Sequence, residues 1–170
     1  MLAPDYYYES VFLIPYKELW QRKIRGLIFD IDNTLTPYGQ QLPAAKVVGL
    51  LHKLQRMGFR ICFVTNNTTG RLNRFNQHLS LDGIANAGKP LTKGIRKAMN
   101  LMGTQPSHTA IIGDQLLTDV WAGRNARITT VLVKPMTEKD FFWVYAKRAL
   151  ERFLLRKYFA ALDAKDKPKT

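Results

Sequence analysis

The stretch Gly26-Leu-Ile-Phe-Asp-Ile-Asp-Asn-Thr-Leu35 decides the fold of this chain. Its first half is a short apolar run, typical of a strand that is buried on both faces of a parallel sheet. Its second half places two carboxylates, Asp30 and Asp32, where that strand ends. Side chains two residues apart on extended backbone point the same way. We therefore expect both carboxylates to face one small volume beyond the sheet edge.

Two like charges at that separation repel each other unless a cation lies between them or one of them carries a proton. A catalytic or metal-binding pair would meet this condition. The alternative is that Asp32 only forms a turn or caps the next segment, as Asp-Asn pairs often do.

Outward from this stretch, residues 25–133 alternate strand-like and helix-like segments, the pattern of a parallel sheet with crossover helices. Strands are expected at 26–31, 59–64, 109–113 and 129–133, with a further candidate at 84–88. Helices are expected from Pro43 to Gly58, over about 70–79, from an N-cap at Thr92 to 102, and around 118–125. The expected fold is thus α/β, with a three-layer, Rossmann-like parallel sheet of four or five strands.

Both ends of the chain differ from this core, and we expect them to belong to one domain over 1–170. Residues 1–24 form an aromatic-rich, irregular lead-in with a short helix after Pro15. Residues 138–162 are expected to form one amphipathic helix with an apolar arc for docking. Its other side alternates arginines with aromatic residues: Arg148, Arg152 and Arg156 with Phe141, Tyr145 and Phe159. This side could face a membrane interface, or could be a solvated basic face whose aromatic residues pack on the lead-in.

Positive charge dominates the composition. The 170 residues include 26 Lys and Arg against 13 Asp and Glu, which gives a net charge of +13. Such a surface favours a negative partner: nucleic acid, an anionic membrane or a phosphorylated substrate. Within residues 30–133 only five acidic residues occur, so each needs its own explanation. They are Asp30, Asp32, Asp82, Asp114 and Asp119, of which Asp82 matches no motif and is expected in a loop.

The sequence predicts neither export nor a membrane span. Its apolar runs are far shorter than the roughly 20 residues that cross a bilayer, and no signal-peptide pattern opens the chain. Cys62 is the only cysteine, which excludes an internal disulfide and fits a reducing cytosol. It lies in an apolar strand, where we expect it to fill the core. We therefore expect a cytoplasmic protein.

Reactive side chains also follow the other expected strands. Thr65, Lys89, Asp114 and Asp119 all lie near strand ends, where open parallel sheets collect their chemistry. Each could have a simple structural role: a turn, a surface charge, a helix cap or a first-turn acid. Four unrelated structural roles that all fall at strand ends are a less economical explanation than one shared site.

These motifs resemble the haloacid dehalogenase superfamily. The segment Phe29-Asp-Ile-Asp-Asn-Thr-Leu35 matches its first motif, Thr65 its second, Lys89 its third, and Gly113-Asp114 to Asp119 its fourth, all in order. The wording of the four motifs is similar to that of the YqeG-type phosphatases of class IIIA. That type is in turn similar to the enzymes assigned to the dephosphorylation of phosphatidylglycerophosphate.

The resemblance implies a role for each matching residue. Asp30 would be the nucleophile that forms an aspartyl-phosphate, and Asp32 the general acid and base. Thr65 and Lys89 would be catalytic residues that bind phosphate. Asn66 would also bind phosphate. Mg²⁺ would be held by the carboxylates of Asp30 and Asp114 and by the Asp32 backbone carbonyl, with Asp119 as a further ligand or just behind the ligands.

The intervals between motifs predict an open site without a cap domain. In this superfamily lids are inserted between the first and second or the second and third motifs, and these intervals span only 35 and 24 residues here. An open site suits a phosphate carried on something large. The leading hypothesis is a Mg²⁺-dependent phosphatase that acts on phosphatidylglycerophosphate and binds the anionic inner face of the cell membrane peripherally.

Two alternatives remain open. The net charge would suit a phosphatase of nucleic-acid ends or of phosphoproteins, although the sequence has no recognisable base-stacking or groove-reading motif, which disfavours nucleic acid. A non-catalytic RNA- or ribosome-binding module would be a different class of protein. It would not need Asp30, Asp32, Lys89 and Asp114 together.

Overall fold

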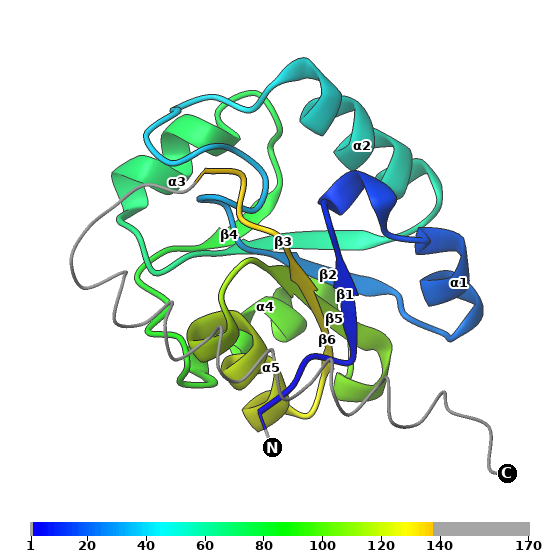
Figure 1. Cartoon of the computed structure of the whole chain (residues 1–170). Coiled ribbons are helices and arrows are strands. Elements are labelled where there is room, and N and C mark those ends of the chain that lie inside the picture. The colour runs from blue at the N-terminus through cyan, green and yellow to red at the C-terminus, as the bar shows by residue number, and fades with distance from the viewer. Residues whose placement is uncertain (1, 138–170) are drawn as a thin grey trace, which may run out of the picture.

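Six parallel strands form the centre of the computed structural model, which describes residues 2–137 (Figure 1). Their order across the sheet is β1-β6-β5-β2-β3-β4, and every neighbouring pair is parallel. The strands are β1 (Tyr6–Tyr8), β2 (Gly26–Phe29), β3 (Arg60–Val64), β4 (Asp82–Ile84), β5 (Thr109–Gly113) and β6 (Thr129–Val133). Strand β2, which leads into Asp30, is central and entirely buried. The α/β fold with a Rossmann-like parallel sheet is confirmed.

Helices cover both faces of this sheet and so complete three layers (Figure 1). They are α1 (Tyr16–Gln21), α2 (Ala45–Arg56), α3 (Thr69–Asn76), α4 (Lys93–Met102) and α5 (Trp121–Ala126). Helices α1, α2 and α3 share one apolar core with one face of the sheet, and α4 and α5 share a second core with the other face. The short segments η1 (Val11–Leu13) and η2 (Pro106–His108) are 3-10 turns, and η3 (Leu116–Val120) is π-helical. The two cores hold the strands rigidly, so their carboxyl ends form a fixed edge.

The lead-in contributes more order than its sequence indicated. Strand β1 extends the sheet by pairing with β6, and Asp5 just before it binds Thr130: its carboxylate accepts hydrogen bonds from the Thr130 backbone N–H and hydroxyl at 2.8 and 2.9 Å. Three residues carry too little periodicity to reveal a strand. The helix expected after Pro15 is present as α1.

Three local expectations were wrong. Strand β4 covers Asp82–Ile84 rather than 84–88, because the chain turns at Asn86 and Gly88, both of which have positive φ. Asp82 accordingly begins a strand instead of lying in a loop. Thr92 does precede α4, but its side chain makes no capping hydrogen bond.

The intervals between the motifs contain no folded insert within residues 2–137. Between β2 and β3 the chain forms a loop and α2, and between β3 and Lys89 it forms α3 and β4. The site at the carboxyl edge of the sheet is therefore uncapped by these segments. The amphipathic helix expected at 138–162 lies outside the described residues. Among residues 2–137, no helix is long and apolar enough to cross a membrane.

Candidate active site

The ammonium group of Lys89 lies at the centre of the carboxyl edge of the sheet. It donates hydrogen bonds to Asp30 Oδ1 and Asp119 Oδ1, both at 2.6 Å, and to the Val64 carbonyl oxygen at 2.8 Å. Its side chain is 2% exposed. Burial disfavours the charged form, but the neighbouring carboxylates of Asp119 and Asp30 outweigh it and raise the pKa of Lys89 above its ordinary value. Lys89 therefore stays charged and belongs to the site rather than to the positive surface.

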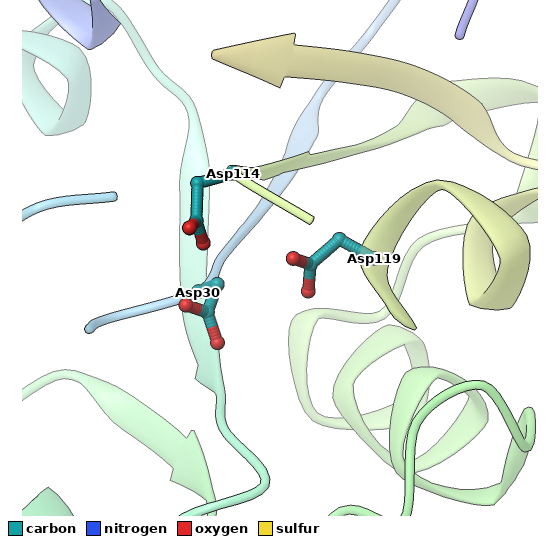
Figure 2. Close-up of side chains that lie close together, drawn as sticks. All are labelled: Asp30, Asp114 and Asp119. Atoms are coloured by element: carbon teal, nitrogen blue, oxygen red, sulfur yellow. The ribbon is translucent and has the colours of Figure 1, made fainter. Parts of the chain in front are cut away.

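Three buried carboxylates surround this cation. Asp30, Asp114 and Asp119 each offer an oxygen, and these atoms lie within 4.8 Å of one another. Figure 2 shows the three side chains converging from the end of β2, the end of β5 and the start of the following helical segment. Burial raises the pKa of Asp30 to about 7, although Lys89 opposes the shift. Burial and the charges of Asp30 and Asp119 raise the pKa of Asp114 well above its ordinary value. One ammonium thus cannot compensate three acids.

Gly113 permits the close approach of Asp119. A Cβ at Gly113 would lie 2.3 Å from Asp119 Cγ, nearer than atoms can pack. The π-helical segment η3 then turns the chain back so that the Gln115 backbone N–H donates to Asp119 Oδ2 at 3.1 Å. Since Oδ1 already accepts from Lys89, both oxygens of Asp119 are engaged. Asp119 is thereby suited to hold Lys89 behind the metal ligands, one of the two roles that the sequence left open.

Asp32 faces different partners from those of Asp30. Its Oδ1 accepts from Arg71 Nε at 3.0 Å and from Nη2 at 2.8 Å, and its Oδ2 accepts from Asn67 Nδ2 at 3.0 Å. Strand β2 ends at Phe29 and Asp32 forms a bridge with Thr36, so the two carboxylates of the motif have separate hydrogen-bond partners. That both face one volume stays a prediction. Each acid has a cation of its own, Lys89 for Asp30 and Arg71 for Asp32, and the charge of Asp32 still contributes to the raised pKa of Asp30.

Thr65 and Asn66 follow directly after β3. The Thr65 hydroxyl accepts a hydrogen bond from the Asn67 backbone N–H at 3.0 Å, so its proton can be donated to a ligand. The Asn66 side chain instead binds the backbone of Lys89. Its Oδ1 accepts from the Lys89 backbone N–H at 2.7 Å, and its Nδ2 donates to the Lys89 carbonyl oxygen at 3.0 Å. Asn66 thus fixes the Lys89 segment. Phosphate binding by Thr65 and Asn66 stays a prediction, and in Asn66 it would fall to the backbone N–H.

Sequence reasoning missed Arg71 and Asn67. The signal for Arg71 was its place in α3, next to buried Leu72 and one turn before buried Phe75. A cation on the core-facing side of a helix needs a carboxylate partner. Residues 30–133 contain only five acidic residues that could be this partner. Arg71 also donates to the backbone carbonyls of Gln40 and Gln41, both at 2.9 Å. It therefore joins α3, Asp32 and the loop before α2.

The three carboxylates fit a divalent metal ion. Carboxylate oxygens are the ligands that hard cations such as Mg²⁺ prefer, and here they converge with an excess of negative charge that Lys89 leaves uncompensated. Thr34 contributes further order, since its hydroxyl donates to Asp114 Oδ1 at 3.2 Å. Asp30 and Asp114 would supply the ligands. The Asp32 side chain is committed to Arg71, so Asp32 could take part only through its backbone carbonyl.

Sequence comparisons agree with this arrangement. A family model described as haloacid dehalogenase-like hydrolase matches residues 38–127. The Bacillus subtilis (strain 168) protein named "Probable phosphatase YqeG" is 31% identical over 152 residues, which cover 89% of this chain and 88% of that protein. A protein of Pyrococcus abyssi (strain GE5 / Orsay) named "Glyceraldehyde 3-phosphate phosphatase" is 22% identical over 71% of this chain, which spans about half (52%) of that protein.

Solved structures show the same fold. The structure described as "NagD from E.coli K-12 strain" superposes with a TM-score of 0.56 at 17% identity, over 68% of this chain and 90% of that chain. At that identity the match concerns the arrangement of strands and helices.

Removal of the Asp114 charge should change the pH dependence of stability in the metal-free protein. The pKa of Asp114 is higher in the folded protein than in the unfolded chain, so its cost to stability appears as pH rises above about 4 and is complete above the folded pKa. Asp114→Asn keeps an oxygen for Thr34 but removes this charge. We expect the metal-free variant to gain thermal stability over the wild type at pH 8 and much less at pH 4.5.

Added Mg²⁺ should raise the melting temperature of the wild type at pH 8 by a few degrees and that of Asp114→Asn by little, because a ligand that binds only the folded state stabilises it. Differential scanning fluorimetry measures both effects. Asp82→Asn, which removes an exposed carboxylate, serves as the matched control. A metal-induced shift of equal size in Asp114→Asn would contradict the site.

Proposed function

This chain belongs to the haloacid dehalogenase-like hydrolases and is a phosphoric monoester hydrolase, and we propose that Asp30 carries its reaction. The observation behind this proposal is the buried Asp30–Lys89 contact inside a cluster of three acids. A carboxylate held by a charged amine, at the fixed edge of a sheet, is a nucleophile whose position is determined before the substrate arrives.

In the first step, an oxygen of Asp30 attacks phosphorus and the bond to the leaving alcohol breaks. Asp32 donates its proton to the leaving oxygen, so the alcohol departs neutral. In the second step, Asp32 takes a proton from water, whose oxygen attacks the phosphorus and releases Asp30. Arg71 and Asn67 orient Asp32 for both transfers. The two acids have distinct partners, and this separates the nucleophile from the proton carrier.

Charge neutralisation is the remaining requirement of phosphoryl transfer. We propose that Thr65 and backbone N–H groups after β3 bind the phosphate oxygens. Lys89 would act through its charge, because its three N–H groups already donate to Asp30, Asp119 and the Val64 carbonyl. Mg²⁺, held by Asp30, Asp114 and the Asp32 carbonyl, would neutralise charge on the transferring group when bound. Asp119 keeps Lys89 in place.

For the substrate, we propose phosphatidylglycerophosphate, hydrolysed at the inner face of the cell membrane by a cytoplasmic protein. Exposed apolar side chains near the site support contact with a lipid surface. Leu91 follows Lys89 by two residues, Trp121 follows Asp119 by two, and Tyr38 lies beside Asp32. Large apolar side chains that are exposed around an uncapped site can enter the boundary between headgroups and acyl chains.

The exit of the chain supports the same proposal. The Met136 backbone N–H donates to the Asn33 carbonyl at 3.0 Å, and the Thr137 hydroxyl donates to Asn33 Oδ1 at 2.6 Å. Asn33 is the neighbour of Asp32. Thr137, the last described residue, therefore lies next to Asn33, and the sequence after it, 138–162, is basic and rich in aromatic residues. Each Lys or Arg near an anionic leaflet contributes about 1 kcal/mol to binding.

Asp30→Asn should abolish turnover while the fold persists. The amide has the shape of the carboxylate but lacks its nucleophilic charge, so we expect a loss of at least about 1,000-fold in kcat. Phosphate release with Mg²⁺ measures the loss, and circular dichroism checks the fold. Undiminished turnover in a folded Asp30→Asn variant would refute the assignment.

Lys89 should matter far more than other lysines of the same region. Lys89→Met removes a buried charge beside the transferring group, whereas Lys93→Met and Lys97→Met remove exposed charges on α4. We expect kcat/KM to fall about 100-fold or more in the first variant and less than about twofold in the other two. Equal small losses in all three would be inconsistent with the proposal.

The lipid substrate is tested on vesicles. Wild-type protein should sediment with vesicles that contain anionic phosphatidylglycerol and should release phosphate from phosphatidylglycerophosphate in them. The double variant Tyr38→Ser, Leu91→Ser should sediment less and turn over the lipid more slowly, because it lacks two exposed apolar side chains. Leu101→Ser, an exposed leucine on α4, is the control.

A wild type that ignores anionic vesicles would overturn the membrane proposal. If it prefers 5′-phosphorylated oligonucleotides over phosphatidylglycerophosphate when both are offered, the substrate is a nucleic-acid end.

A further inference from the structure

A pocket of about 310 Å³ opens beside Asp32. Its walls come from the loop before α2 and from the start of α3, and Asp32 lies where it meets the site. Asp30 and Lys89 are not among the residues that line it. The pocket therefore borders the proposed proton carrier and not the proposed nucleophile.

The pocket carries an uncompensated positive charge. Arg71 and Asp32 neutralise each other at 2.8 Å. Arg74, one turn further along α3, is exposed, and its hydrogen bond goes to the neutral Gln41 Oε1 at 3.5 Å. Asp32 is the only carboxylate among the described residues that line the pocket. The charge of Arg74 is thus available to an anion.

Space for such an anion exists next to Arg74. A Cβ at Gly70 would meet nothing nearer than Thr68 Oγ1 at 4.0 Å, and one at Gly39 would meet nothing within 4 Å. Both glycines line the pocket. Tyr38, 51% exposed, forms a flat side wall. The pocket is polar and open, which suits a charged or hydroxylated group better than an acyl chain.

We propose that this pocket binds an anionic group on the leaving alcohol and that Arg74 is its partner. This inference rests on the proposed function, in which Asp32 protonates the leaving oxygen. The leaving oxygen of the alcohol must then lie at Asp32, and the rest of the alcohol can occupy the adjoining pocket. The substrate class is a phosphomonoester whose alcohol carries a second negative charge, a phosphodiester or a carboxylate, a short distance from the scissile bond. Arg74 would be a specificity residue and would take no part in bond cleavage.

A matched pair of substrates tests the carboxylate form. sn-Glycerol 3-phosphate and L-glycerate 3-phosphate share one configuration at C2 and differ in one group, a neutral CH₂OH against a carboxylate. Dihexanoyl phosphatidylglycerophosphate, soluble without vesicles, adds the phosphodiester form. In the wild type with Mg²⁺, at least one anionic substrate should be hydrolysed with a higher kcat/KM than glycerol 3-phosphate.

Two variants of the full chain should remove this preference. Arg74→Ala removes the charge, and we expect the ratio of kcat/KM, anionic over neutral substrate, to fall about tenfold, mainly through a higher KM. Gly70→Leu fills the pocket and should lower the same ratio. Arg56→Ala and Gly49→Leu make equivalent changes at exposed positions of α2 and should leave the ratio as in the wild type.

The outcomes separate this inference from the proposed function. A ratio that falls in Arg74→Ala for one anionic substrate supports the pocket and names the group that it binds. A ratio that Arg74→Ala leaves unchanged for both overturns the pocket, while hydrolysis that depends on Asp30 leaves the function intact. If the wild type hydrolyses none of the three substrates and no other phosphomonoester, the proposed function itself fails.

Discussion

The ammonium of Lys89 is the one group on which the order of the sheet edge depends. It joins the ends of β2 and β3 to the segment after β5, since its three hydrogen bonds go to Asp30, the Val64 carbonyl and Asp119. Without a cation among them, buried carboxylates this close would repel or take up protons. Asn66 anchors the backbone of the same lysine. The position of the candidate nucleophile is thus fixed by a charge that arrives from 59 residues further along the chain.

The two acids of the first motif show how one short stretch can provide two chemical environments. Asp30 is buried with Lys89, and its pKa is raised to about 7 by loss of solvent. Asp32 lies two residues later, after the end of the strand, where Arg71 and Asn67 bind it at the wall of an open pocket. The proposed nucleophile and the proposed proton carrier therefore each have a cation of their own.

Sequence patterns predicted the central strands and the side chains that gather at their ends, because buried parallel strands are continuous apolar runs and their ends converge by topology. The patterns did not predict features that depend on contacts between segments distant in the sequence. Strand β1 has three residues, and its pairing with β6 comes from a segment more than 120 residues away. Arg71 has no motif of its own, and its role depends on three partners that the sequence keeps 30 or more residues distant. The partners of the Asp32 side chain were not predicted either, because Asn67 and Arg71 lie 35 and 39 residues further along the chain.

The contact of Met136 and Thr137 with Asn33 holds the end of the described chain close to Asp32. A partner that bound the sequence after Thr137 would be kept close to Asn33, the neighbour of Asp32. Tethering replaces a bimolecular encounter by an intramolecular one and gives millimolar effective concentrations when the linker is short. A surface that holds this segment weakly would still present its phosphates to the site many times before release. With the proposed lipid substrate, such a catalyst would need little affinity for an individual headgroup, because residence on the surface would supply the encounters.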